Sequence, residues 1–69
     1  MRIRWVDGFQ IRAAVHDGEV VISANREGML SLANILLDLA EETSGTHIHL
    51  DAYNSLDDES CELVIERTV

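Results

Sequence analysis

The stretch FQIRAAVHDGEVVISANREGMLSLANILLDLAEE, residues 9–42, contains the change of pattern that decides the fold. In its first part, residues 9–16, apolar residues occupy every second position. An alternation of period two is typical of a strand that buries one face. After Ala24 the spacing of apolar residues changes to about 3.6, which is the period of a helix. The stretch therefore predicts strands followed by a helix.

Two Asp-Gly pairs, Asp7-Gly8 and Asp17-Gly18, separate runs of β-prone residues. Asp-Gly is preferred in the two-residue turn of a β-hairpin, because that turn needs positive φ angles. Two such turns in succession predict a three-stranded meander. We expect its strands at residues 2–6, 9–16 and 19–24.

We expect a helix over residues 26–42, with Asn25 as its N-cap and Gly45 in the turn that ends it. Gly28 falls in the first helical turn, where glycine is unfavourable. Either another segment passes close to the backbone at Gly28, or the helix begins later. Residues 47–52 and 61–67 then alternate as strands, and a polar loop, residues 53–60, joins them.

These elements predict an α+β fold for one small domain, residues 1–69. The expected order is a β-meander, one helix and a β-hairpin (βββαββ), with all strands in one sheet and the helix packed on one face. The pattern leaves the strand order open.

The expected helix has an apolar arc of roughly 220°, wider than the stripe of about 100° that packs on one sheet. We expect the centre of the arc to face the sheet, namely Met29, Ala33, Leu36, Leu37 and Ala40. The residues at its edge, Leu32, Ile35 and Leu39, are then candidates for a second surface. Sheet curvature would cover these three, or they would form a homodimer or partner interface.

Composition excludes several classes of function. The chain has 69 residues, of which thirteen are acidic and five are basic, and its net charge is -8. Proteins that read nucleic acid or bind anionic membranes need a basic face, so we exclude both. The most apolar segment, residues 29–40, is shorter than the roughly 20 residues of a membrane span. Cys61 is the only cysteine, and no secretory signal is visible, so we expect a cytoplasmic protein.

The charge is unevenly distributed. From Met1 to Leu37 four acidic and four basic residues cancel, whereas from Asp38 onward nine acidic residues accompany only Arg67. This division favours an acidic recognition surface for a basic protein, although acidic residues also serve solubility. The candidate partners are a basic protein and a second copy of the chain.

Few residues suggest chemistry. His47 and His49 alternate on one strand face with Asp51 next to them, a set that can bind zinc, recognise a partner or simply form a polar face. The remaining candidate ligands, His16 and Cys61, have no recognised spacing to this pair, so we expect no metal and no cofactor. A nucleophile elbow and a glycine-rich phosphate loop are also missing. We therefore expect a protein without catalytic residues, not an enzyme.

The stretches ISANREGMLSLAN, residues 22–34, and THIHLD, residues 46–51, resemble immunity protein 32 of bacterial polymorphic toxin systems. The most specific pieces are Asn-x-x-Gly-x-x-x-Leu-Ala and His-x-His-x-Asp, and the resemblance extends to the closing strand, residues 62–66. It implies a cytoplasmic antidote that binds and neutralises a toxin encoded beside it. The motif positions, mostly determinants of the fold, are Asn25, Gly28, Leu32, Ala33, His47, His49 and Asp51.

The residues and the resemblance together predict a non-enzymatic binding protein whose acidic surface covers a basic toxin. The alternative is a self-associating structural module that dimerises through Leu32, Ile35 and Leu39. The residues expected to contact the partner are Asp38, Glu41, Glu42, Asp57, Asp58 and Glu59, together with His47, His49 and Asp51.

Overall fold

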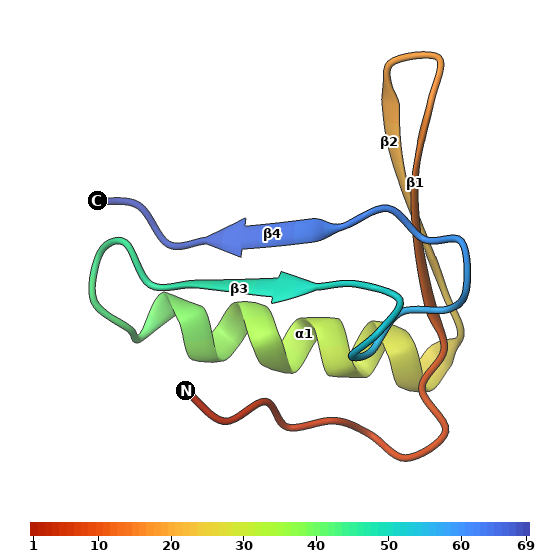
Figure 1. The fold of residues 1–69 in the computed structure, drawn as a ribbon. Coiled ribbons are helices and arrows are strands. Elements are labelled where there is room, and N and C mark those ends of the chain that lie inside the picture. The colour runs from red at the N-terminus through yellow and green to blue at the C-terminus, as the bar shows by residue number, and fades with distance from the viewer.

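The computed structural model describes residues 1–69 and contains one helix and four strands (Figure 1). In chain order these are β1 (Ile11–His16), β2 (Glu19–Ala24), α1 (Arg26–Ala40), β3 (His47–Leu50) and β4 (Leu63–Glu66). β1 pairs with β2 and β3 pairs with β4, each antiparallel, and the two pairs form separate sheets. The predicted α+β class is confirmed, but the βββαββ order in a single sheet is wrong.

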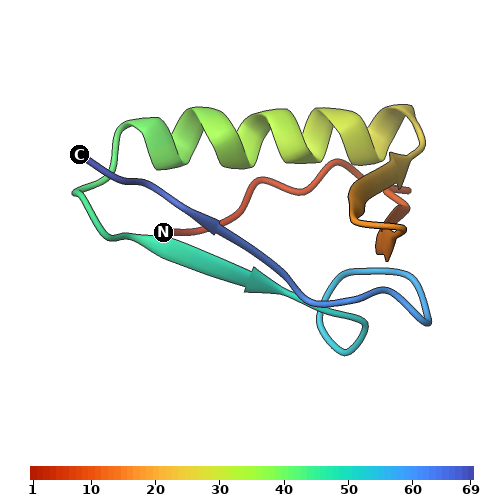
Figure 2. The same ribbon diagram turned by 90° about the horizontal axis from the view of Figure 1, so that it is seen from above.

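The β3–β4 sheet lies along α1, and the β1–β2 hairpin stands across the N-terminal end of the helix (Figures 1 and 2). The core fills the space between these elements. Both β1 and β3 contribute to it, as do α1 and the loop after β3, whereas β2 contributes no buried residue. The core residues are Ile11, Ala13, Leu32, Ile35, Leu39, Leu50 and Leu56.

The turn between β1 and β2 is the one that the sequence predicts. Asp17 and Gly18 have φ angles of +50° and +79°, as a two-residue hairpin turn of type I′ requires. The register runs from His16 opposite Glu19 to Ile11 opposite Ala24. Asp-Gly at residues 17 and 18 therefore fixes which side chains share a face.

The start of the helix is also confirmed. The Asn25 side chain accepts a hydrogen bond from the Gly28 N–H at 2.8 Å, which satisfies one of the free donors of the first turn. A Cβ atom at Gly28 would collide with the Gln10 carbonyl oxygen and lie 2.9 Å from the Ala24 Cβ. Of the two readings of Gly28, the close approach is correct, because the backbone before β1 crosses the helix at this point.

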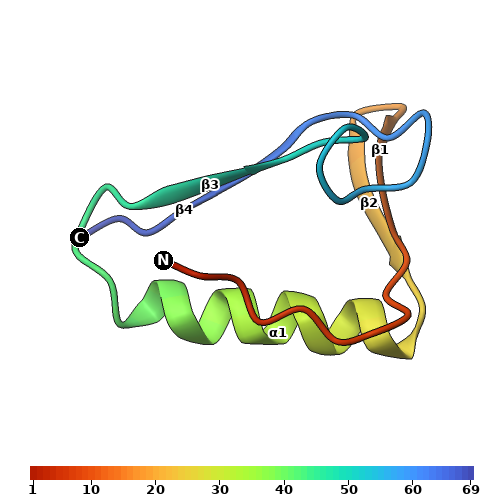
Figure 3. The same ribbon diagram turned by 60° about the horizontal axis from the view of Figure 1, so that its bottom comes forward.

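Residues 1–10 do not form the predicted strand 2–6. They run antiparallel to α1 and beside it (Figure 3). The Asp7-Gly8 turn is present, with the Phe9 N–H donating to the Val6 carbonyl at 3.1 Å, but no strand pairing follows from it. We call residues 1–10 the N-terminal arm.

Polar side chains of α1 replace the missing sheet partner of the arm. The Val6 N–H donates to Ser31 Oγ at 2.8 Å, and Asn34 Nδ2 donates to the Arg4 carbonyl at 2.9 Å. Asp38 binds the Arg4 side chain, so a stripe of Ser31, Asn34 and Asp38 follows one side of the helix. The alternation of residues 2–6 suggested a strand because it gives no sign that the backbone of the arm would hydrogen bond to side chains of α1 instead of to a neighbouring strand.

The prediction for the two helix faces is wrong. Leu32, Ile35 and Leu39, the candidates for a second surface, are 9%, 0% and 3% exposed and belong to the core, so of the two alternatives left open for them the structure has the one in which they are covered. The residues assigned to the sheet are exposed, because Met29, Leu36 and Leu37 face solvent and so do Ala33 and Ala40. The arm occupies the polar side of α1, and both sheets then pack against the edge of the apolar arc next to it. When the apolar arc of a helix is wider than the area that packing on a sheet covers, the sequence does not indicate which edge of the arc is buried.

The C-terminal strands are shorter than predicted. β3 ends at Leu50 rather than at residue 52, because Asp51 begins a hydrogen-bonded turn. β4 begins at Leu63 rather than at residue 61, because the Cys61 N–H donates to the Ala13 carbonyl at 2.9 Å and leaves the β3–β4 ladder. α1 is neither long nor apolar enough to cross a membrane.

Candidate functional site

Asp38, one of the expected contact residues, belongs to the fold. Its carboxylate accepts two hydrogen bonds from Arg4, at 3.0 Å from Nε and 2.7 Å from Nη2. These hydrogen bonds lower the pKa of Asp38 below its usual value. A carboxylate with both oxygens held by an arginine of the same chain is poorly suited to recruit a basic partner.

Asp51 also has a structural role. Its Oδ1 accepts hydrogen bonds from the N–H groups of Tyr53 at 2.8 Å and Asn54 at 3.1 Å. Its carbonyl accepts a further bond from the Leu56 N–H at 2.8 Å, which turns the loop so that Leu56 enters the core. The loop in turn leaves the Tyr53 side chain fully exposed.

The remaining acidic residues lie at two ends of the molecule. Glu41 and Glu42 follow the C-terminal end of α1, while Asp57, Asp58 and Glu59 lie in the loop beside the hairpin at the opposite end (Figure 1). A helix of 15 residues is about 22 Å long, so the two groups do not form one compact site. The structure therefore divides the expected contact residues.

The loop of residues 57–61 is held against β1. The Asp57 N–H donates to the Ile11 carbonyl at 2.8 Å, and the Ala13 N–H donates to Ser60 Oγ at 3.2 Å. Only backbone groups and Ser60 make these contacts, so the three acidic side chains remain exposed. A pre-ordered loop with free carboxylates loses little conformational entropy on binding a cationic partner.

The outer face of the β3–β4 sheet continues this acidic surface. His47 is opposite Glu66 and His49 is opposite Val64, so these side chains share the solvent face. Glu62 precedes β4 and lies 3.3 Å from His49, measured between Oε2 and Nδ1. The sequence indicated this face through its alternation, but Glu62 and Glu66 were missed as candidate contact residues.

We define the acidic strip as five exposed carboxylates that follow the chain from the loop along β4. Only Glu62 has a basic side chain within 4 Å, and that side chain is His49. No arginine pairs with the strip, and the fully exposed Tyr53 lies in the loop that precedes it. The members of the strip are Asp57, Asp58, Glu59, Glu62 and Glu66.

The histidine pair does not form a metal centre. The rings of His47 and His49 lie edge to face with centroids 5.1 Å apart, and His47 Nδ1 is 3.0 Å from the Gly45 carbonyl oxygen. No group of three His, Cys, Asp or Glu side chains has a geometry suited to a metal ion. The third residue of the suggested set, Asp51, instead binds the loop backbone.

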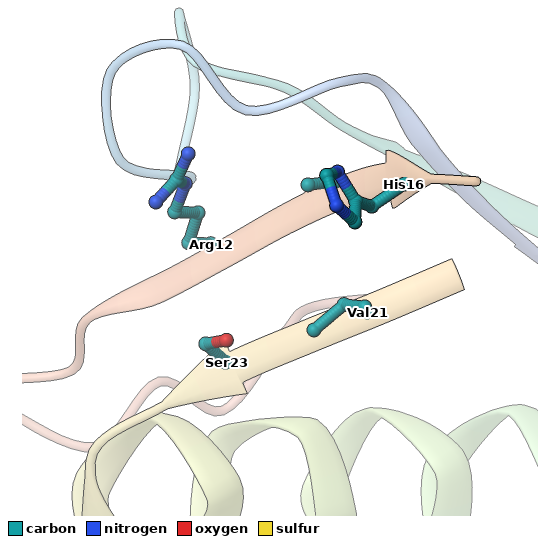
Figure 4. Close-up of a pocket in the computed structure, with 5 residues that line it drawn as sticks. Arg12, His16, Val21 and Ser23 are labelled. Atoms are coloured by element: carbon teal, nitrogen blue, oxygen red, sulfur yellow. The ribbon is translucent and has the colours of Figure 1, made fainter. Parts of the chain in front are cut away.

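One open hollow of about 320 Å³ lies on the polar face of the β1–β2 hairpin (Figure 4). Arg12 and His16 from β1 and Val21 and Ser23 from β2 line it together with Ala14. His16 and Ser23 are residue types that can act as a base and a nucleophile. Ser23 lies opposite Arg12 and His16 opposite Glu19, so the two are separated along the hairpin, and no hydrogen bond joins them.

Comparison with models of known protein families matches residues 19–68 to Immunity protein 32. The match includes β2, α1, β3 and β4 and excludes the arm and β1. No curated protein and no solved structure matches the chain significantly. The match spans the helix with its Asn25 cap and Gly28 crossing, the histidine pair and the whole acidic strip. The chain therefore belongs to the Immunity protein 32 family.

Proposed function

We propose that the protein neutralises a cognate toxin by binding it through the acidic strip and Tyr53. The observation that carries this proposal is the strip itself, because its exposed carboxylates have no arginine partner within the chain. Family membership supports an immunity role, and an antidote needs a surface that recognises a protein. The strip holds five of the nine acidic residues that follow Leu37.

The mechanism is occlusion and requires no chemistry by this chain. The acidic potential attracts a basic partner such as a nuclease toxin and raises the association rate. Tyr53 supplies an aromatic anchor, a residue type that contributes strongly to the stability of protein interfaces. The bound protein then covers the active site of the toxin and excludes its substrate. We place this encounter in the cytoplasm of the bacterium.

The test is protection of bacterial cells from the toxin encoded beside the gene. The double variant Asp57→Asn/Asp58→Asn should lower protection and the association rate by about tenfold or more. Glu41→Gln/Glu42→Gln is the matched control, because it removes the same charge at the end of the molecule away from Asp57 and Asp58. We expect this control to protect cells almost fully.

A further variant tests the contribution of the Tyr53 side chain separately from that of the charges. Tyr53→Ala should raise the dissociation rate and leave the salt dependence of association unchanged, since no charge is altered. Thermal unfolding of each variant should stay close to that of the parent chain, because Glu41, Tyr53, Asp57 and Asp58 are exposed and Glu42 is only half-buried. Equal loss of protection in the Glu41→Gln/Glu42→Gln control would overturn the strip as the binding surface.

A further inference from the structure

The β1–β2 hairpin exposes aliphatic side chains on both of its faces. Val15 and Val20 are 64% and 67% exposed on one face, and Val21 is 42% exposed on the other. Five of the six residues of β2 are exposed. A two-stranded ribbon without further packing has marginal stability in water, and large exposed apolar patches on soluble proteins mark interaction sites. The hairpin thus exposes apolar side chains that no other part of the chain covers, as α1 does at Leu36 and Leu37, and unlike α1 it adds an unpaired strand edge to them.

The two edges of the hairpin differ. The edge of β1 is covered at its base, because Ser60 and Cys61 use both the N–H and the C=O of Ala13. Ala13 therefore has no hydrogen bond to spare for Ile22, its partner in β2. Backbone groups alternate in direction along a strand, so those of Val20 and Ile22 point away from β1. The edge of β2 is open along its length, and no proline, lysine or bulge blocks it.

The charges around this edge favour a second copy of the chain. The open edge lies within residues 1–37, the part of the chain whose formal charges cancel. Glu19 begins β2 and Arg26 follows its end, and Arg26 makes no ion pair in the structure. If the β2 strands of two copies pair antiparallel, Glu19 at the start of β2 in one copy lies near the end of β2 in the other copy. Arg26 follows that end, so an acidic and a basic side chain come close together. A parallel pair would instead bring Glu19 next to its own copy.

We infer that the protein forms a twofold symmetric dimer in which the β2 strands of two copies pair antiparallel through Val20 and Ile22. The two hairpins then make one four-stranded sheet, and Val20 and Ile22 of both copies share its apolar face. This closed pairing uses the open β2 edge of each copy, so pairing through β2 stops at two copies. The acidic strip lies beyond the covered edge of β1 and stays free in each copy.

The test measures the mass of the full chain in solution. Sedimentation or light scattering at micromolar concentration should give twice the chain mass of 7.7 kDa. Val20→Lys should raise the dimer dissociation constant by about tenfold or more, because it places two like charges at the paired edge. Leu37→Lys is the matched control, since Leu37 is 64% exposed on α1 and receives the same charge. We expect it to remain dimeric.

A charge exchange keeps the inference testable if Val20→Lys fails to fold. Glu19→Arg and Arg26→Glu should each weaken the dimer, and the double variant should restore it. A parent chain that remains monomeric at high micromolar concentration would overturn the inference, as would open-ended assembly. Loss of the dimer in Leu37→Lys but not in Val20→Lys would likewise overturn it and assign the interface to α1. None of these outcomes depends on a toxin.

Discussion

The two hairpins of this protein differ in their connections and in their attachment to the body. A two-residue turn joins β1 to β2, whereas residues 51–62 join β3 to β4. β3–β4 places alternate residues on the core, with Leu50 2% exposed and Ile48, Leu63 and Ile65 packed against it. β1–β2 buries only Ile11 and Ala13 near its base. Both hairpins thus reach the core, β3–β4 along its length and β1–β2 only at its base, where hydrogen bonds of Asn25 add to the attachment. A hairpin attached only at its base leaves its outer strand free for another chain.

Truncation of a core side chain should have the largest effect on the free energy of unfolding and should test the difference between the two hairpins most clearly. Leu50→Ala in β3 should lower the free energy of unfolding by about 2–5 kcal/mol, because it leaves a cavity between the sheet and α1. Val20→Ala in β2 removes a side chain that is 67% exposed and should change monomer stability by less than about 0.5 kcal/mol. Urea unfolding of both variants at low protein concentration provides the measurement.

Equal losses in the two variants would show that Val20, near the tip of the β1–β2 hairpin, is packed in solution as tightly as the core residue Leu50. Amide hydrogen exchange adds a residue-level check on the same point. We expect the amides of Val20 and Ile22 in the monomer to exchange faster than those of β3, because they face the open edge.

Gly28→Ala should have the next largest effect, because it acts on the attachment of β1–β2. The new methyl group meets the Gln10 carbonyl oxygen and the Ala24 Cβ, which are fixed by the hairpin register. Overpacking of this kind lowers stability by about 1–3 kcal/mol, more than the gain of up to about 1 kcal/mol in helix propensity. Thermal unfolding should therefore show a lower Tm, and exchange should accelerate in β1 more than in β3.

Met29→Ala is a suitable control for Gly28→Ala, since Met29 is the next residue of α1 and is 50% exposed. We expect its Tm to stay near that of the parent chain. A Gly28→Ala variant that is more stable than the parent would mean that the arm and the base of the hairpin move aside without loss of stability. The attachment of β1–β2 would then be less rigid than the structure indicates.

Local signals in the sequence predicted local structure well. Asp17-Gly18, the Asn25 cap and the Gly28 crossing each depend on backbone geometry within a few residues, and each is confirmed. The failures concern which elements meet. Alternation in residues 2–6 could not reveal that Ser31 and Asn34 would bind the arm, and the wide arc of α1 could not reveal which edge the sheets would cover.

The same limit applies to the candidate site. The sequence placed the net charge in the second half but could not separate carboxylates with partners from those without. Asp38 and Asp51 proved to be bound within the chain, by Arg4 and by the loop backbone. The alternation of residues 62–66 places Glu62 and Glu66 on the same sheet face as the two histidines, so the sequence contained the signal that identifies them. Their recognition role remains a prediction.

The smallest effect concerns the arm, which neither hairpin holds in a sheet. The Arg4 side chain lowers the pKa of Asp38, so the folded state releases the proton of Asp38 more readily than the unfolded chain does. The stability from this pair is complete above the unfolded pKa of about 3.9 and is lost as the pH falls through the lower folded pKa. Arg4→Met should therefore have a lower Tm than the parent at neutral pH, and the difference should vanish at strongly acidic pH.

An NMR titration of the Asp38 carboxyl tests the cause directly. In the parent chain its pKa should lie below the usual value, and in Arg4→Met it should return toward that value, because the hydrogen bonds from the guanidinium are gone. Both partners are accessible to solvent, so added salt should reduce the difference in Tm between the two chains. An identical Asp38 titration in the two chains would mean that Arg4 and Asp38 do not stay paired in solution. The arm would then be held by its hydrogen bonds with Ser31 and Asn34 and by the packing of its apolar side chains, Ile3, Trp5 and Phe9, against the core.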